Sequence, residues 1–244
     1  MKRLLILIVI LLMSAAQVQA AKIDAYQQIL ASGRYTIRYE NLTPAPRVTN
    51  RNVVELYGKN GLIIETNVVF LNRPISGVIV GDGDNRYEEV GYKGFFQCRL
   101  VKGGDNFIFT HYPVTGGGVE YFGEKKGKVA ANPRNYLVEL LSGESFGDAT
   151  FTEMMNATEL KKYQFVASGE TTAGMAYEDF SYRDGATVSA IRYYFDGDTL
   201  KKIAFATATD GKLRKCIVRI VEFSSAPVQS LLSLPSGLVD TTKR

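Results

Sequence analysis

The sequence contains no tryptophan, one histidine and two cysteines in 244 residues. The histidine, His111, is well separated from Cys98 and Cys216, whereas metal sites are usually recognised from closely spaced ligand pairs. We therefore expect no metal and no cofactor, and interpret His111 as a structural residue at a strand end. The two cysteines permit a disulfide, but buried free thiols fit their strand-like surroundings equally well, and both alternatives stay open.

Apolar runs long enough to span a membrane are lacking. The run at 4–13 follows Lys2 and Arg3 and is much shorter than the roughly 20 residues that a spanning helix needs. Small residues around Ala20 complete the pattern of a secretory signal. We expect 1–20 to be a cleaved signal peptide and 21–244 a single domain. No cysteine follows the apolar run to carry a lipid anchor, so we expect a soluble periplasmic or extracytoplasmic protein without stable membrane insertion.

An excess of positive charge is also missing. The net charge is +4, and it falls to +2 when Lys2 and Arg3 leave with the signal peptide. Nucleic-acid binding usually requires a concentrated basic face, so we expect no nucleic-acid partner. Apolar residues make up 45% of the chain, which is enough for a substantial core.

The hydrophobic pattern predicts mainly strands. Apolar positions at helical spacing predict a helix over 22–32, and Gly33 is a natural stop. The period then changes to two, which predicts strands separated by glycine-containing turns. The predicted early strands are 35–39, 53–57, 62–71, 78–80, 87–90, 95–101 and 107–112.

The middle of the chain differs from both flanks. An Asn-Pro start and a leucine-rich stripe predict a helix over 132–143, and a second helix is expected over 152–160. Strand patterns resume after Tyr163, at 175–182, 189–195, 199–206 and 213–223. This order predicts an α+β fold: one curved antiparallel sheet with helices packed on one face.

Two Asp-Gly-Asp clusters, at Asp82 and Asp196, suggest a calcium loop. Counted from Asp82, however, Arg86 and Tyr87 stand where that loop needs an acidic ligand and a glycine. The second cluster places Leu200 and Lys201 there. Because Asp-Gly is also a favoured hairpin turn, we predict hairpins and no metal at either cluster.

Gly-Glu-Ser-Phe-Gly at 143–147 matches the nucleophile motif of serine hydrolases. Its serine, Ser145, would need a histidine that follows it in the chain, but His111 precedes it. Hydrolysis at Ser145 is a remote alternative, and we expect no enzyme activity.

Aromatic residues are abundant despite the absence of tryptophan, with 14 Tyr and 13 Phe. Many lie on alternating strand positions. Such positions are typical of a sheet core, and they also suit an apolar concave surface that binds a hydrophobic ligand. Both interpretations stay open.

Several segments resemble the bacterial outer-membrane lipoprotein carrier superfamily. These are the closing segment LLSLPSGLVDTTKR (231–244), the late strands from DGDTLKKIAF onward, the helix NPRNYLVELLSG (132–143) and the hairpin IVGDGDNRYEEV (79–90). Asn-Arg-Pro at 72–74 resembles the family's Arg-Pro pair.

The resemblance implies an open half-barrel whose helices cap a hydrophobic concavity, and a ligand that is buried reversibly without a covalent step. We expect a lipid, an acylated protein or another hydrophobic ligand. The expected ligand-binding residues are Arg73, Tyr35, Ile37, Tyr39 and Phe195. The alternative is an envelope interaction or sensor module on the same fold, with a protein partner and no lipid.

Overall fold

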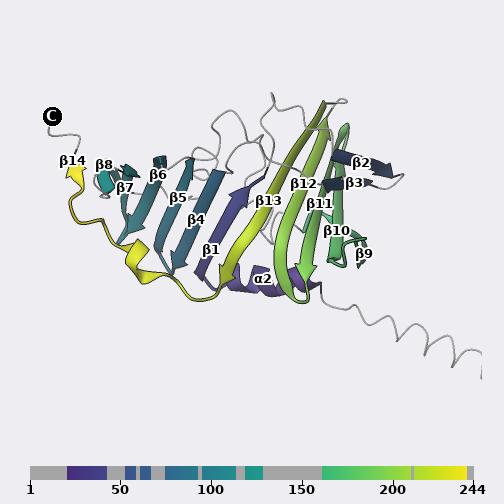
Figure 1. Ribbon diagram of the computed structural model, residues 1–244, viewed down its shortest axis with the longest axis horizontal. Coiled ribbons are helices and arrows are strands. Elements are labelled where there is room, and N and C mark those ends of the chain that lie inside the picture. The colour runs from purple at the N-terminus through teal and green to yellow at the C-terminus, as the bar shows by residue number, and fades with distance from the viewer. Residues whose placement is uncertain are drawn as a thin grey trace, which may run out of the picture.

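In the computed structural model, the described residues are 21–42, 53–58, 61–66, 75–92, 95–113, 119–128, 161–209 and 212–240. They form a helix, a separate two-stranded hairpin and a twelve-stranded sheet (Figure 1). The elements are α2 (Lys22–Ala31), β1 (Arg34–Asn41), β2 (Val53–Gly58), β3 (Gly61–Thr66), β4 (Ile75–Asp82), β5 (Asn85–Tyr92), β6 (Phe95–Lys102), β7 (Asp105–Pro113), β8 (Val119–Lys128), β9 (Gln164–Glu170), β10 (Ala176–Asp184), β11 (Thr187–Asp196), β12 (Thr199–Thr209), β13 (Lys212–Ser224), η1 (Gln229–Leu232) and β14 (Val239–Asp240).

The large sheet consists of two strand meanders joined through β1. Its order is β14-β8-β7-β6-β5-β4-β1-β13-β12-β11-β10-β9. β1 pairs antiparallel with β4 on one side and with β13 on the other. The sheet is curved and does not close, so β9 and β14 are its edges (Figure 1). The predicted fold class, a curved and mainly antiparallel open sheet with helix packed on it, is confirmed.

Both Asp-Gly-Asp clusters lie at hairpin turns, as predicted. Asp82, the last residue of β4, pairs with Asn85, the first residue of β5. Asp196 at the end of β11 pairs with Thr199 at the start of β12. Gly83 and Gly197 sit in the turns with φ values of +61° and +58°. Glycine adopts this left-handed conformation without steric cost, which explains its place between the two acids.

Helix α2 covers one face of the sheet, which we call the helix face. The helix ends before Gly33, whose φ is +70°, close to the predicted boundary. Its buried residue Ile23 packs with inward side chains from β1, β4, β11, β12 and β13. Tyr26 Oη donates to the carbonyl of Asp198 at 2.9 Å and accepts from the Leu200 N–H at 2.7 Å. These contacts fix the helix against the β11–β12 turn.

The C-terminal segment 225–240 covers part of the opposite face, the tail face. It leaves β13 at the centre of the sheet and reaches the far edge, where β14 pairs parallel with β8 (Figure 1). Thr36 Oγ1 donates to the Ala226 carbonyl at 2.8 Å and accepts from the Val228 N–H at 3.0 Å. Leu232 packs into an apolar cluster with Val80, Leu100 and other residues of this face.

Several predicted features lie outside the described residues. They are the signal peptide at 1–20, the helices at 132–143 and 152–160, Arg73 and Ser145. Among the residues that are described, no helix has the length and apolar character needed to cross a membrane. Strands β8 and β9 were not among the predicted ranges.

Candidate functional site

The described residues predicted to bind a ligand all belong to the core of the helix face. Tyr35, Ile37, Tyr39 and Phe195 are buried and cluster together with Ile23 of α2. Side chains of the protein itself surround these aromatic rings. Their role in ligand binding stays a prediction, and their packing matches the alternative interpretation of a sheet core.

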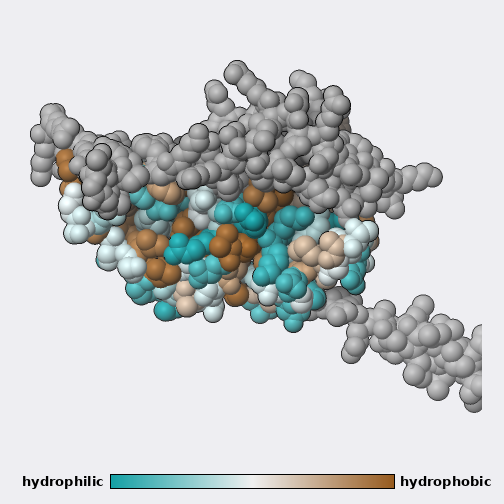
Figure 2. All heavy atoms as spheres, viewed as in Figure 1, coloured by the Kyte–Doolittle hydropathy of each residue, from teal (hydrophilic) through white to brown (hydrophobic). Residues whose placement is uncertain are grey.

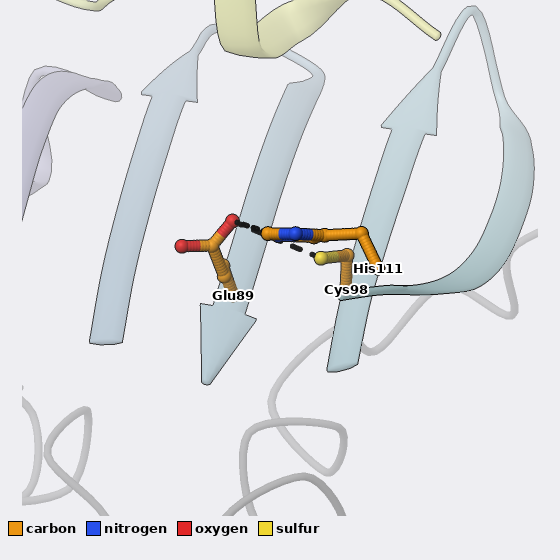
Figure 3. Close-up of side chains that lie close together, drawn as sticks. All are labelled: Glu89, Cys98 and His111. Atoms are coloured by element: carbon orange, nitrogen blue, oxygen red, sulfur yellow. Dashed lines mark hydrogen bonds and ion pairs between the residues drawn. The ribbon is translucent and has the colours of Figure 1, made fainter. Parts of the chain in front are cut away.

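A cluster of polar side chains lies on the tail face of the other half of the sheet. It consists of Tyr87, Glu89, Cys98 and His111, and we call it the Glu89 cluster. Figure 3 shows Glu89, Cys98 and His111 pointing toward one another. Glu89 Oε2 lies 3.0 Å from His111 Nε2, 2.6 Å from Tyr87 Oη and 3.8 Å from Cys98 Sγ. One carboxylate oxygen is therefore the centre on which the other groups converge.

Strand register brings these side chains together. Glu89 on β5 lies directly opposite Cys98 on β6, and Cys98 lies opposite Phe109 on β7. His111 is two residues beyond Phe109, so it projects from the same face one row along. Two short hairpins thus place three chemically distinct groups on neighbouring strands.

Aromatic rings hold His111 in place. The Phe96 ring stacks on the imidazole with a centroid distance of 4.7 Å and an interplanar angle of 13°. The centroid of the Tyr121 ring lies 5.4 Å from that of the His111 ring, with an interplanar angle of 41°. Cys98 is fully buried, whereas the side chains of Glu89 and His111 are 17% and 16% exposed. The cysteine end of the cluster is therefore shielded from solvent, whereas Glu89 and His111 are partly accessible to it.

Cys98 carries a free thiol, so the alternative of a Cys98–Cys216 disulfide is excluded. Burial raises the pKa of this thiol, and the nearby Glu89 carboxylate raises it further against the opposing effect of the Tyr87 hydrogen bond. Burial is also the main reason for the raised pKa of Tyr87. Both groups are protonated at neutral pH unless another charge stabilises their anions.

This geometry does not suit nucleophilic catalysis by Cys98. A reactive cysteine has a lowered pKa and partial exposure, and Cys98 has neither. Its nearest polar partners are Tyr87 Oη at 3.4 Å and Glu89. His111 Nε2 is directed at the carboxylate. Thiol, imidazole and carboxylate are, however, all metal ligands, and their donor atoms lie within 4.8 Å of one another.

This cluster was not predicted, because His111 and the cysteines are well separated along the chain. The usable signal was the hairpin register. The predicted strands 87–90, 95–101 and 107–112 are joined by short turns, which fix the pairing of Glu89 with Cys98 and the face of His111.

A second candidate site is an open groove beside the edge strand β9, which we call the β9 groove. It has a volume of about 760 Å³. Its lining residues are Lys162, Gln164, Phe165, Val166, Ser181, Tyr182, Arg183 and Val188. The Phe165 and Phe180 rings meet edge to face with a centroid distance of 5.7 Å, yet 56% of Phe165 remains exposed. Exposed phenylalanine beside two cationic side chains gives this groove an amphipathic lining.

No protein-family model and no curated protein matches the chain. Among solved structures, the chain is similar to PNGF-II in its C2 crystal form, with 12% sequence identity and a TM-score of 0.23. The match covers 85% of this chain and 30% of PNGF-II. The chain thus spans less than a third of that protein, and the likeness supports no statement about fold or function.

Proposed function

We propose that this chain is a non-enzymatic binding protein of the cell envelope, and that it holds an amphiphilic ligand with an apolar chain and an anionic head. The observation that carries the proposal is the β9 groove. Phe165 and Val166 are large apolar residues that stay 56% and 39% exposed on an edge strand. Exposed apolar side chains gathered in a concave site are a common mark of ligand binding.

Charge complements the apolar part of the groove. Lys162 and Arg183 line the same space as Phe165 and Val188. A carboxylate or phosphate head can pair with these cations while an acyl chain covers the phenylalanine. Each buried CH₂ contributes about 0.8 kcal/mol, so a short length of acyl chain gives measurable affinity. The N-terminal signal pattern and the resemblance to lipoprotein carriers favour an envelope location for this binding.

Native mass spectrometry of the purified chain, with lipid extraction in parallel, tests the proposal. We expect a bound species with the mass of a lipid or fatty acid. After delipidation, a fluorescent fatty acid should bind saturably, and Phe165→Ala should weaken its binding about tenfold or more because an apolar contact worth roughly 1.5–3 kcal/mol is lost.

Val221→Ala is the matched control. Val221 is 60% exposed but lies on β13, away from the residues that line the groove. Its substitution should leave fatty-acid affinity unchanged. Absence of any bound lipid together with non-saturable probe binding would refute the proposed function.

Edge strand β9 also favours a second candidate, an envelope protein-interaction module. β9 pairs with β10 on one side only, and its residues are almost all exposed. An extended segment of another protein can add to such an edge through backbone hydrogen bonds. A co-purifying protein in place of a lipid in the same mass spectrum would favour this candidate.

A further inference from the structure

We propose that Glu89, Cys98 and His111 form a binding site for a divalent transition-metal ion of the zinc class. The site is separate from the β9 groove, since it lies on β5, β6 and β7, in the other half of the sheet. Its ligands are one carboxylate oxygen, one thiolate sulfur and one imidazole nitrogen. Water completes the shell from the side on which Glu89 and His111 are exposed.

The spacing of the donor atoms suits a tetrahedral ion. Bonds of about 2.3 Å to sulfur and about 2.0–2.1 Å to nitrogen and oxygen separate the ligand atoms of such a site by roughly 3.3–3.6 Å. Here the oxygen lies 3.0 Å from the nitrogen and 3.8 Å from the sulfur. All three donor atoms lie within 4.8 Å of one another, so side-chain rotations that bring them to these separations would admit the ion.

Electrostatics also favour a dication. Glu89 and the Cys98 thiolate carry two negative charges, and neutral His111 adds none, so a dication makes the site neutral. Neutrality matters because the sulfur is fully buried, where an uncompensated charge is costly. Binding of the ion releases the thiol proton of Cys98 to solvent as the metal–sulfur bond forms. Mixed sulfur, nitrogen and oxygen ligands are typical of zinc.

Neighbouring side chains orient the ligands. Tyr87 Oη donates a hydrogen bond of 2.6 Å to Glu89 Oε2, and Phe96 stacks on the His111 ring. Contacts of this kind hold ligands in place, and their loss commonly lowers metal affinity about 10–100-fold. We therefore assign Tyr87 as a positioning residue of the site.

The test is titration of the purified, tag-free chain with Zn²⁺ against a chromophoric chelator, and with Co²⁺ as a spectroscopic probe. The chain has one histidine and two cysteines, so the background of adventitious soft ligands is low. We expect one ion per chain and, for Co²⁺, a sulfur-to-metal charge-transfer band. Cys98→Ser should abolish the band and stoichiometric binding, and Tyr87→Phe should keep the band with about 10–100-fold weaker binding.

Cys216→Ser, which removes the other thiol, is the matched control and should bind like the wild-type chain. Circular dichroism of the metal-free variants checks their folding. If Cys98→Ser does not fold, His111→Gln replaces it. His111 is partly exposed, so its substitution leaves the buried Cys98 and its packing unchanged. Failure of the wild-type chain to bind one ion, or unchanged binding by a folded Cys98→Ser or His111→Gln variant, overturns the proposal. Phe165→Ala should not change metal affinity, so the two proposals fail independently.

Discussion

Charged side chains buried within the sheet are the most consequential individual residues outside the candidate sites. Arg192 on β11 makes two hydrogen bonds to Asp179 on β10, at 2.6 Å and 2.8 Å. Their side chains are only 6% and 9% exposed. The guanidinium also lies over the Tyr177 ring, 3.9 Å from its centroid. The pair is therefore largely desolvated, and the Asp179 carboxylate offsets part of the cost of burying the guanidinium.

Asp179→Ala should lower the free energy of unfolding by about 3–5 kcal/mol, because it removes a carboxylate that compensates the buried Arg192 charge. Urea denaturation measures the loss. The double variant Asp179→Leu/Arg192→Met, which removes both charges, should recover most of it. A single variant as stable as the wild type would show that Arg192 reaches solvent or another carboxylate.

At the scale of elements, helix α2 depends on a strand for its N-terminal cap. Its N-cap residue, Ala21, makes no side-chain hydrogen bond to the helix. Instead, Glu178 of β10 accepts from the N–H groups of Lys22 at 2.6 Å and Ile23 at 3.2 Å. A carboxylate at this end of a helix also interacts favourably with the helix dipole. The buried Glu178 thus joins the helix to the far half of the sheet.

Glu178→Ala should cost about 1–3 kcal/mol of unfolding free energy, since two N–H groups lose their acceptor. Hydrogen exchange of the α2 amides should accelerate more than that of the strands. Glu222→Ala is a suitable control, because the side chains of its ion pair with Arg38 are 42% and 40% exposed and such a pair is worth at most about 1 kcal/mol. Equal effects of the two substitutions would contradict the capping role.

The elements differ in how far the sequence predicted them. Helix 22–32 and the hairpin turns at Asp82 and Asp196 follow from local chemistry, and the structure confirms them. β8 and β9 carry weaker alternation, which local patterning could not resolve. The pairing of β1 with β13 is a contact between distant segments, and no local signal specifies it.

At the scale of the whole molecule, the sheet depends on β13. This strand pairs with β1 on one side and with β12 on the other, so it attaches the later meander to β1. It also leads into the C-terminal segment that covers the tail face. The Glu89 cluster was missed for a related reason: its members are separated in the chain, and only the register of the two hairpins brings them together.

A chain that ends at residue 210, without β13 and the segment that follows, should therefore lose the cooperative unfolding transition of the intact protein. β1 and β12 would each expose an unpaired edge, and Leu232 would leave the tail-face core. Urea titration followed by circular dichroism measures this, with a chain ending at residue 240 as the control. A wild-type transition in the shorter chain would contradict a central role for β13.

The pairing of β1 with β13 also has a consequence for the order of events during synthesis. Arg38 and Glu222 bond to each other across a sequence separation of 184 residues. A ribosome makes β13 long after β1, so the centre of the sheet stays incomplete until β13 has been synthesised. A nascent chain that has not yet reached β13 would therefore hold two halves of a sheet that are still unjoined.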